Sequence, residues 1–564
     1  MDTKSILRLI RVGFFILIGS LFYLQIIKGD YFYQKAKNNY IRIVPQEAIR
    51  GAIFSADGER LAYDRAMFNI AVIPYQIKNT KDCLFKEIAD FLNIKKEKLI
   101  KNYQKNWRGY FLPVNILTNV RKEEALRIKE KFGDKIFINI SSLRFYPYSY
   151  AFSHILGYVK EAKVFYKDLK KYGYSRWERV GVRGVEKVYN DYLRGENGVT
   201  LLEVNSQGKI TGFLGKTFPR KGKDIYLTID ARMQKIAYKV LGGKRGAIIL
   251  MSPYSGRIFV CVSSPSFNLS DFIQGKNIRR FIKDSRFPLI NRATSARYSP
   301  GSIFKPIVGI AGLEERLIDT STYFNCSGRF RLGERTFSCW GIHGRENIIE
   351  AIKHSCNIYF YNLGLKLGVD KISFWARQFG LDKPTGIDIP SEKKGLIPSR
   401  SWKKRYRKGS WRAGDTLNFS IGQGYIEITP LEATVAISVF ANGGYLVTPY
   451  LVEKIEEEGF PHQGERKLYL SPENIEIIRK GMIKAVEDED GTAHFLKKLN
   501  LKIAGKTGTA QNPMGKPHGW FVGFFPYGRP RYSICVFLEN GGSSFNALVV
   551  AYKFLLRLKE ENLL

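Results

Sequence analysis

Residues 298–306 read YSPGSIFKP, in which Ser302 and Lys305 lie three positions apart and Pro306 follows directly. The Pro-Gly pair before the serine interrupts regular structure, and the residues after the lysine, PIVGIAGLEERL, have helical periodicity. Proline is tolerated only near the start of a helix, so this helix must begin just before Pro306. Ser302 and Lys305 are then predicted to share one face of the first turn, with their side chains in contact range.

This spacing places an amine beside a hydroxyl group that is otherwise a poor nucleophile. A lysine held in a partly desolvated, cation-rich cleft can lose its proton and serve as the base for a neighbouring serine. The N-terminus of the helix adds backbone N–H groups near the same oxygen. A helix cap with a surface lysine is the ordinary alternative for any single S-x-x-K pattern, so the pattern alone is a weak signal.

The chain holds at least three further S-x-x-K patterns, at Ser206–Lys209, Ser391–Lys394 and Ser401–Lys404. The first lies in a polar turn that contains glycine. The other two lie in charged segments interrupted by proline, where loops are expected. None of these settings matches that of Ser302, which is therefore the candidate nucleophile.

Two more short motifs follow along the chain. An S-x-N motif, Ser355 to Asn357, lies inside residues 348–368, whose spacing is helical. A K-T-G motif begins at Lys506, after a predicted strand, LKIAG, and before a turn, QNPMG. Taken singly, these motifs could be polar residues on a helix surface and a turn at a strand end. In the order S-x-x-K, S-x-N and K-T-G they are typical of penicillin-binding proteins and class A β-lactamases.

The composition limits the partners of the protein. A chain of 564 residues predicts roughly two to four domains. The 90 Lys and Arg residues against 52 Asp and Glu give a net charge of +38, which favours an anionic partner. No nucleic-acid motif and no run of five or six basic residues is found, so we expect no nucleic acid and favour an anionic membrane or substrate. An even spread of charge that only keeps the protein soluble is the alternative.

The N-terminus predicts a single membrane anchor. Val12–Ile27 is uncharged, and a span over 6–27 reaches the length a bilayer needs if Arg8 and Arg11 extend toward the headgroups. No small-x-small cleavage site follows, so we expect an uncleaved anchor rather than a removed signal peptide. The basic residues before the span place the short tail, 1–5, in the cytoplasm and the rest of the chain outside.

The remainder of the chain predicts an α+β protein in two parts. Residues 28–240 mix short alternating strands with charged helical stretches and lack a strong core signal. Within this part, 181–198 predicts a helix bounded by glycines. Near the end of this part, 224–241 predicts a strand followed by an amphipathic helix capped at Asp230. Residues 245–264 then predict a hairpin, which we expect to join strands near 502–540 in one sheet. The three motifs fall in the second part, 241–564.

The motifs and their surroundings resemble the class B penicillin-binding proteins, and among these the elongation-type penicillin-binding protein 2 group. The resemblance covers nearly the whole chain and rests on the anchor, the three motifs and four longer segments: RGAIFSADGERLA (50–62), SHILGYVKEA (153–162), GVRGVEKVY (181–189) and SIGQGYIEITPLE (420–432). It implies a pedestal over 28–240 for dimerisation or partner binding, and a transpeptidase domain over 241–564 with a central antiparallel sheet flanked by helices.

The resemblance also implies an activity, the serine-type cross-linking of peptidoglycan stem peptides. Ser302 would attack the carbonyl of the penultimate D-Ala of a donor stem, releasing the last D-Ala, and Lys305 would take the serine proton. Ser355 would pass protons between the lysine and the leaving group, and Asn357 would hold the donor's amide. An amine of a neighbouring stem would resolve the acyl-enzyme, with hydrolysis as a carboxypeptidase side activity. A β-lactam would acylate the same serine, and no cofactor takes part in the chemistry.

In this resemblance the K-T-G motif binds the terminal carboxylate of the donor. Lys506 and Thr507 would make the contacts, which suits a cationic site. Gly508 and Thr509 belong to the same substrate-binding segment. The backbone N–H groups of Ser302 and Thr509 would form the oxyanion hole.

Three of the six cysteines gather with a histidine, at Cys326, Cys339, His343 and Cys356. Three cysteines and one histidine suit a tetrahedral structural zinc site, and some elongation-type members resemble this chain in having zinc at the corresponding place. A Cys326–Cys339 disulfide with a buried Cys356 thiol is the alternative in an oxidising compartment, and free thiols are a third possibility. The expected metal is a structural zinc with no part in catalysis.

A place and a set of partners follow from the resemblance as well. We expect the protein in the cytoplasmic (inner) membrane, with its catalytic domain in the periplasm. The expected partners are peptidoglycan stem peptides and β-lactams, a SEDS-family (RodA-like) glycosyltransferase contacted through anchor and pedestal, and other elongation-complex proteins. The alternative functions are a septal transpeptidase, a β-lactam sensor or β-lactamase, and a non-enzymatic activator of the polymerase.

Overall fold

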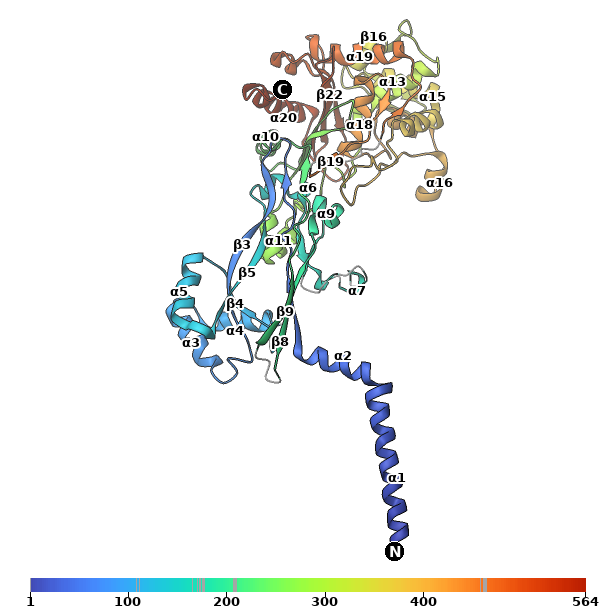
Figure 1. Cartoon of the computed structure of the whole chain (residues 1–564). Coiled ribbons are helices and arrows are strands. Elements are labelled where there is room, and N and C mark those ends of the chain that lie inside the picture. The colour runs from blue at the N-terminus through green and yellow to red at the C-terminus, as the bar shows by residue number, and fades with distance from the viewer. Residues whose placement is uncertain are drawn as a thin grey trace. The chain divides into compact units, whose positions relative to one another are not determined.

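The computed structural model in Figure 1 describes residues 2–564 apart from 108, 111, 165, 170, 172–173, 175–177, 206–209, 457 and 460–463. The chain forms two compact units, each made from several stretches of sequence. The first unit comprises Met1–Gly51, Asp64–Arg144 and Arg194–Gly222. The second comprises Ala52–Tyr63, Phe145–Leu193 and Lys223–Leu564.

The first unit begins with the predicted apolar helix. Helix α1 covers Thr3–Phe22 and continues through a wider turn, η1, over Tyr23–Ile27. This 25-residue span contains an 18-residue stretch with a mean hydropathy of 2.0 and is long and apolar enough to cross a membrane. Its side chains are exposed along the whole length, as expected for a helix whose surroundings are lipid. Helix α2, Gly29–Tyr40, follows it (blue in Figure 1).

The rest of the first unit contains two groups of strands. Strands β1 (Ile41–Gln46), β8 (Gly198–Val204) and β9 (Ile210–Thr217) form an antiparallel three-stranded sheet. The other group consists of β3 (Arg60–Val72), β4 (Val114–Val120) and β5 (Phe137–Phe145), and a small apolar core joins it to α3 (Lys81–Phe91), α4 (Lys96–Lys105) and α5 (Lys122–Phe132). The alternating strands and charged helices predicted for this region are thus present.

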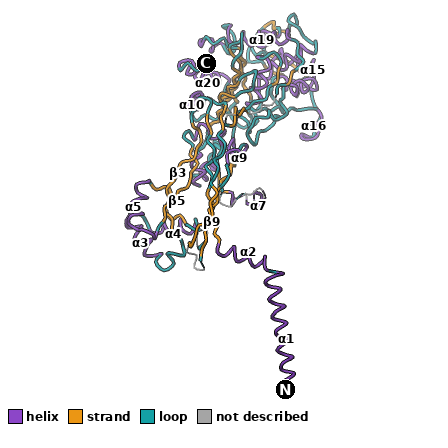
Figure 2. The backbone as a smooth tube through the Cα atoms, viewed as in Figure 1, coloured by secondary structure: helices purple, strands orange, loops and turns teal. Residues whose placement is uncertain are grey.

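A five-stranded sheet organises the second unit. Its order is β12 (Ile258–Ser264), β11 (Gly246–Met251), β23 (Tyr532–Leu538), β22 (His518–Phe525) and β21 (Ala504–Ala510), and every neighbouring pair is antiparallel. This confirms the predicted α+β class and the sheet assembled from distant stretches of sequence. The orange strands and purple helices in Figure 2 show how helices cover the sheet.

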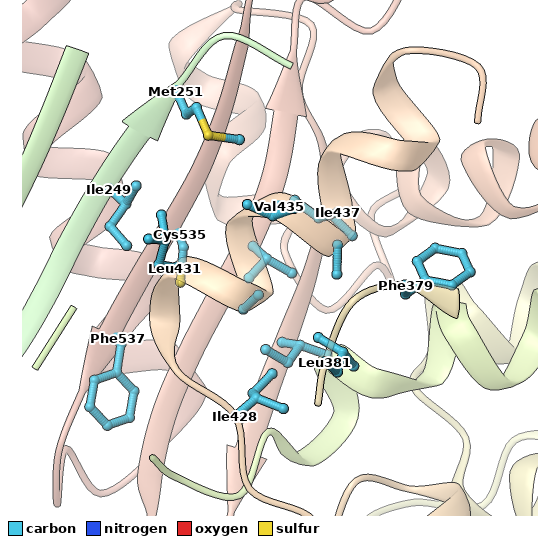
Figure 3. Close-up of a cluster of buried hydrophobic side chains, with 14 of the residues drawn as sticks. Ile249, Met251, Phe379, Leu381, Ile428, Leu431, Val435, Ile437, Cys535 and Phe537 are labelled. Carbon is cyan, nitrogen blue, oxygen red and sulfur yellow. The ribbon is translucent and has the colours of Figure 1, made fainter. Parts of the chain in front are cut away.

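Both faces of this sheet are buried, and the alternation of side chains along β11 shows how. Ile249 and Met251 face a core that includes α18 (Pro430–Ala441), whereas Ile248 and Leu250 face a second core that includes α10 (Ala231–Leu241) and α20 (Ser544–Glu560). Figure 3 shows part of the first core, where Leu431 of α18 lies beside Cys535 of β23. A strand covered on both faces reads as a continuous apolar run, which explains the sequence AIILM.

Local signals at the start of the second unit behave as the sequence predicts, with one exception. The cap of α10 is Asp230, whose carboxylate accepts hydrogen bonds from Arg232 N and Met233 N. The 245–264 hairpin is formed by β11 and β12. The helix expected across the 181–198 segment is instead divided into α8 (Gly184–Val188) and α9 (Asn190–Arg194).

Helices and short strands around the sheet supply the functional loops. They include α13 (Lys305–Glu314), α14 (Ile348–Lys353), α15 (Asn357–Gln378), α16 (Arg400–Arg407), α17 (Ala413–Ser420), α19 (Pro472–Glu487), β13 (Phe324–Cys326), β14 (Arg329–Leu332), β15 (Arg335–Ser338) and β16 (Gly344–Glu346).

Candidate active site

The segment with Ser302 is a 3₁₀ turn that runs directly into a helix. Gly301–Phe304 forms the turn η5 and α13 follows, with Pro306 in its first turn, as the sequence predicts. Residues i and i+3 of a 3₁₀ turn lie one above the other, so Ser302 and Lys305 share a face. Ser302 is half-buried, and Lys305 is completely buried.

Lys305 directs its ammonium group at the S-x-N motif. In the described part of the chain, Lys305 Nζ donates to Ser355 O at 2.7 Å, to Ser355 Oγ at 3.3 Å and to Asn357 Oδ1 at 2.7 Å. These bonds use the three donors of a lysine, and Ser302 Oγ is not among the acceptors. The two side chains predicted to be in contact range therefore share a face without a hydrogen bond, a common state of catalytic groups before substrate binds.

The S-x-N motif lies between two helices, whereas the sequence predicted one continuous helix. Helix α14 ends before the motif and α15 begins at its asparagine. Between them, Ser355 has a left-handed backbone with a φ of +57°. This conformation costs a residue with a side chain about 1–2 kcal/mol. The break leaves the carbonyl and hydroxyl oxygens of Ser355 within hydrogen-bonding distance of Lys305 Nζ.

The K-T-G motif lies within a strand, although the sequence placed the strand before it. Strand β21 contains the whole motif and pairs with β22 along its full length. The two glycines weaken the strand signal in the sequence, but pairing with a buried neighbour overrides it. Lys506 and Thr507 are buried, and Lys506 Nζ donates to Thr507 O at 3.0 Å. Gly508 is buried as well, and Thr509 is exposed.

A glycine-containing loop, 420–424, contacts both the turn that holds Ser302 and the K-T-G strand. Gly301 N donates to Gly422 O at 2.9 Å, and Gln423 Nε2 donates to Thr509 O at 3.2 Å. A Cβ added to Gly422 would lie 2.1 Å from Gly301 O, so only glycine permits this contact between backbones. Sequence reasoning assigned no role to this loop. Its signal was the SIGQG segment, in which two glycines flank a polar residue.

Burial lowers the pKa of both lysines of the site. It lowers the pKa of Lys305 to about 8, against the opposing effect of nearby cysteine sulfurs. Burial, followed by the charge of Lys305, lowers the pKa of Lys506 well below its usual value. Two ammonium groups close together in a buried site disfavour each other. The arrangement therefore disfavours two positive charges at once, and Lys305 can act as a base in its neutral form.

The other S-x-x-K patterns lack these features. Ser401–Lys404 lies on helix α16 rather than in the expected loop, and both residues are exposed. Ser391 and Lys394 are exposed as well. The Ser206–Lys209 copy lies outside the described residues.

The structure brings the four predicted metal-ligating residues together. The ligand atoms of Cys326, Cys339, His343 and Cys356 all lie within 4.8 Å of one another. His343 Nδ1 is 3.4 Å from Cys326 Sγ and 3.6 Å from Cys339 Sγ. All six cysteines are free, so the alternative Cys326–Cys339 disulfide is not formed here.

Two members of this cluster, Cys339 and His343, favour the protonation states of metal ligands. A hydrogen bond from the Cys356 thiol lowers the pKa of Cys339 to about 4 and raises the pKa of Cys356. Burial lowers the pKa of His343. A thiolate and a neutral imidazole are the forms that bind zinc. Because Asn357 N donates to Cys339 Sγ at 3.2 Å, the cluster is also joined to the S-x-N motif.

Two acidic side chains hold the residue that precedes the S-x-N motif. His354 Nδ1 lies 2.8 Å from Glu346 Oε1, and His354 Nε2 lies 2.7 Å from Asp490 Oδ2. Trp340 Nε1 donates to His354 O at 2.9 Å. These contacts fix the position from which Ser355 makes its left-handed turn. No sequence pattern links them, because Asp490 is 136 residues away along the chain.

Two family models match this chain. The family model of the penicillin binding protein transpeptidase domain matches residues 246–555, which include the sheet and all three motifs. The model of the penicillin-binding protein dimerisation domain matches residues 45–227. A relative, the peptidoglycan D,D-transpeptidase MrdA of Acinetobacter baumannii, is 33% identical over 96% of this chain and 85% of its own length.

Solved structures agree with the sequence comparison. The penicillin-binding protein 2 of Helicobacter pylori, in a complex with MreC, is 31% identical with a TM-score of 0.84, over 93% of this chain and 100% of that one. A chain of a peptidoglycan synthase complex that coordinates polymerization and crosslinking is 27% identical with a TM-score of 0.75, over 98% of this chain and 97% of that one. The chain described here therefore belongs to the penicillin-binding protein transpeptidase family.

Proposed function

We propose that this chain is a peptidoglycan D,D-transpeptidase that cross-links stem peptides during elongation of the cell wall. The observation that carries the proposal is the position of Lys305, which is buried, shares a face with Ser302 and donates to the S-x-N motif. The relatives named MrdA are D,D-transpeptidases, which favours this function over a septal enzyme, a β-lactam sensor or a β-lactamase.

The first half-reaction forms an acyl-enzyme. Ser302 Oγ attacks the carbonyl carbon of the penultimate D-Ala of a donor stem, and its proton passes to neutral Lys305. The C–N bond to the terminal D-Ala then breaks, and the leaving amine takes a proton relayed from Lys305 through Ser355 Oγ, which lies 3.3 Å from Lys305 Nζ. The product is an ester between the donor and Ser302.

Other groups of the site hold the donor during this step. The side-chain amide of Asn357, which accepts from Lys305 Nζ and donates to Ser338 O, would bind the amide of the donor. Lys506 and Thr507 bind its terminal carboxylate, with Gly508 allowing close approach of the substrate strand. The N–H groups of Ser302 and Thr509 stabilise the oxyanion.

The second half-reaction transfers the acyl group to an amine. The amine of a neighbouring stem attacks the ester carbonyl, the C–O bond to Ser302 breaks, and the serine oxygen regains a proton. The result is an amide cross-link. Attack by water instead gives a shortened stem, which is the carboxypeptidase side reaction.

A fluorescent β-lactam tests the proposed nucleophile. We expect the full-length protein in detergent to form a stable covalent label that is lost in Ser302→Ala and retained in Ser391→Ala, a serine of another S-x-x-K pattern. Peptide mapping should place the label on Ser302. A label that persists in Ser302→Ala would overturn the assignment, and rapid release of hydrolysed β-lactam would favour the β-lactamase alternative.

We further propose that Cys326, Cys339, His343 and Cys356 hold a structural zinc ion. Four ligand atoms at this spacing, a cysteine of low pKa and a neutral histidine support the proposal. When bound, the metal would tie the loop after α13 to Cys356 inside the S-x-N motif. It would supply stability and no chemical step.

Metal analysis of the purified protein tests the zinc site. We expect about one zinc per chain, and reduced zinc in Cys326→Ser but not in Cys261→Ser, which alters a cysteine outside the cluster. Protein without metal, in which thiol titration finds two fewer thiols than expected, would instead support the disulfide.

The domain division and location are proposed on the same basis. Residues 6–27 form an uncleaved anchor after a cytoplasmic tail, 1–5. The pedestal over 28–240 and the transpeptidase domain over 241–564 then lie in the periplasm, on the outer face of the inner membrane. Alkaline phosphatase fused after Leu564 should be active in intact cells, whereas an inactive fusion would contradict this orientation.

We propose a RodA-like SEDS glycosyltransferase and other elongation-complex proteins as partners, through the anchor and pedestal. The complex of the Helicobacter pylori protein with MreC and the peptidoglycan synthase complex support this proposal. A Ser302→Ala protein should still activate the polymerase, because the contacts lie away from the catalytic serine. Loss of activation in that variant would contradict separate roles.

A further inference from the structure

Helix α16 carries a concentration of positive charge near the catalytic loops. Of the nine residues from Arg400 to Lys408, six are basic. One of them, Lys403, is buried and pairs with Asp415, which anchors the helix to the start of α17. The other five are exposed: Arg400, Lys404, Arg405, Arg407 and Lys408. We call these five side chains the α16 basic face.

Most of this charge is not neutralised within the protein. Arg400 pairs with Asp370 at 3.0 Å, but both side chains are largely exposed. In the part of the chain that the structure describes, no acidic side chain pairs with Lys404, Arg405 or Lys408. Like charges on neighbouring turns of one helix repel one another. Such a surface gains free energy when an anionic partner covers it.

Aromatic rings continue from this face toward the catalytic serine. The ring of Tyr406, which is 61% exposed, has its centroid 5.8 Å from that of Trp402. The ring centroids of Trp402 and Tyr425 are 5.4 Å apart. The series continues from Tyr425 to Trp411, with ring centroids 6.4 Å apart, and from Trp411 to Phe419, 6.2 Å apart. It ends at Phe304, the residue before Lys305, whose ring centroid lies 5.6 Å from that of Phe419. The α16 basic face is therefore joined by packed side chains to the start of α13.

The loop between α17 and α18 makes the same connection through the backbone. Tyr425 follows the 420–424 loop, whose Gly422 accepts from Gly301 N and whose Gln423 donates to Thr509 O. A polymer lying across Tyr425 would thus be next to the segments that hold the reacting peptide. Flat rings with polar edges, such as those of Tyr406 and Trp402, also suit the apolar faces of sugars.

We propose that the α16 basic face, with Tyr406 and Trp402, binds un-cross-linked peptidoglycan strands through the carboxylates of their stem peptides. This inference rests on the proposed function, because it is that function which brings such strands to the cleft. The face would bind the strand at a distance from the donor and acceptor groups that react. It would thereby raise the local concentration of stem peptides near Ser302. An anionic membrane is the competing ligand, and the experiment below separates the two.

The test measures the affinity of soluble, un-cross-linked, fluorescently labelled peptidoglycan strands for the full-length protein in detergent. The variant Lys404→Gln/Arg405→Gln/Lys408→Gln removes three charges of the basic face. The control Lys95→Gln/Lys98→Gln/Lys101→Gln removes three exposed charges around α4, in the first unit. Both variants should keep the melting temperature of the wild type, since these side chains are exposed.

We expect the α16 variant to bind strands about tenfold more weakly than the wild type at low salt, with a shallower salt dependence. The α4 control should bind as the wild type does. Strands whose carboxylates have been amidated should bind the wild type about as weakly as normal strands bind the α16 variant.

Three results would overturn the inference: unchanged strand affinity in the α16 variant, an equal loss in the α4 control, or equal binding of amidated strands. Phosphatidylglycerol vesicles whose binding falls in the α16 variant while strand binding does not would assign the face to the membrane instead. Failure of the proposed function would be seen in a different experiment. If no β-lactam labels the wild type, the proposed function is contradicted, whereas the affinity for strands is measured without any acylation.

Discussion

The same four-letter pattern gives opposite environments at two places in the second unit. At the start of α13, Ser302 and Lys305 lie in a turn whose lysine is completely buried and donates to Ser355 and Asn357. On α16, Ser401 and Lys404 are both exposed and belong to a basic helix surface. The spacing of a serine and a lysine is therefore not a catalytic device by itself. Burial, and the neighbouring motifs that share it, separate the two copies.

The largest difference expected between the two copies is in acylation. Ser302→Ala should lower the rate of covalent β-lactam labelling at least about 10³-fold, because it removes the attacking oxygen. Ser401→Ala should leave the rate unchanged. Stopped-flow or gel-based labelling measures both. Equal effects of the two substitutions would remove the distinction between the sites.

The pH dependence of acylation tests whether the buried Lys305 is the base. Lys305 must be neutral to accept a proton, and burial lowers its pKa to about 8. Well below that pH the neutral fraction rises about tenfold per unit, so the labelling rate should increase about 50-fold from pH 6 to pH 8 and at most about twofold more above pH 8. Labelling rates across this range, with a β-lactam that does not itself titrate, measure the effect. A flat profile would show that Lys305 is not the group that titrates.

Protein stability should report the same pKa. The unfolded chain binds a proton on this lysine up to its usual pKa of 10.5, whereas the folded protein releases it near 8. Between these values the unfolded state holds more protons, so this group makes stability rise with pH. The free energy of unfolding of the wild type, relative to Lys305→Met, should therefore increase by about 2 kcal/mol from pH 7.5 to pH 9.5. Denaturant unfolding of both proteins at both pH values gives the difference.

A relative stability that stays constant over this range would place the folded pKa of Lys305 near its ordinary value. The comparison with Lys305→Met is needed because other groups titrate in the same range, and their contributions cancel between the two proteins.

The smallest expected effect is a difference in stability between substitutions at two adjacent lysines of α16. Lys403 is buried and pairs with Asp415, so Lys403→Met should lower the free energy of unfolding by about 1–2 kcal/mol. Lys404→Met should change it by less than about 0.5 kcal/mol, because this side chain is exposed. Thermal or denaturant unfolding measures both. Equal losses would mean that the exposed face of α16 is packed against another part of the protein.

The parts of the fold that the sequence predicted are those with local signals. The helix start at Pro306, the cap at Asp230 and the apolar run AIILM each depend on residues close together in the chain, and all three are present. The grouping of Cys326, Cys339, His343 and Cys356 was also predicted, because their spacing and chemistry suggested one metal site.

The parts that the sequence did not predict depend on contacts between distant segments. The 348–368 pattern stays helical in its apolar spacing across Ser355, yet the chain breaks there, where Lys305 binds the carbonyl of Ser355 and two acids hold His354. The strand character of Lys506 to Ala510 comes from pairing with β22 rather than from its own composition. The SIGQG segment indicates a turn at 420–424, but nothing in the local sequence indicates its contact with Gly301.

The close contacts among backbones at the site also bear on how the protein can change under antibiotic selection. A Cβ at Gly301 would meet Thr509 O at 2.7 Å, and one at Gly508 would meet Ile303 Cγ2 at 2.9 Å. Neither glycine can be replaced without moving the segments that hold the serine, so mutations there are lost together with the activity. Substitutions that weaken β-lactam binding but keep the activity are therefore expected at positions other than these two glycines.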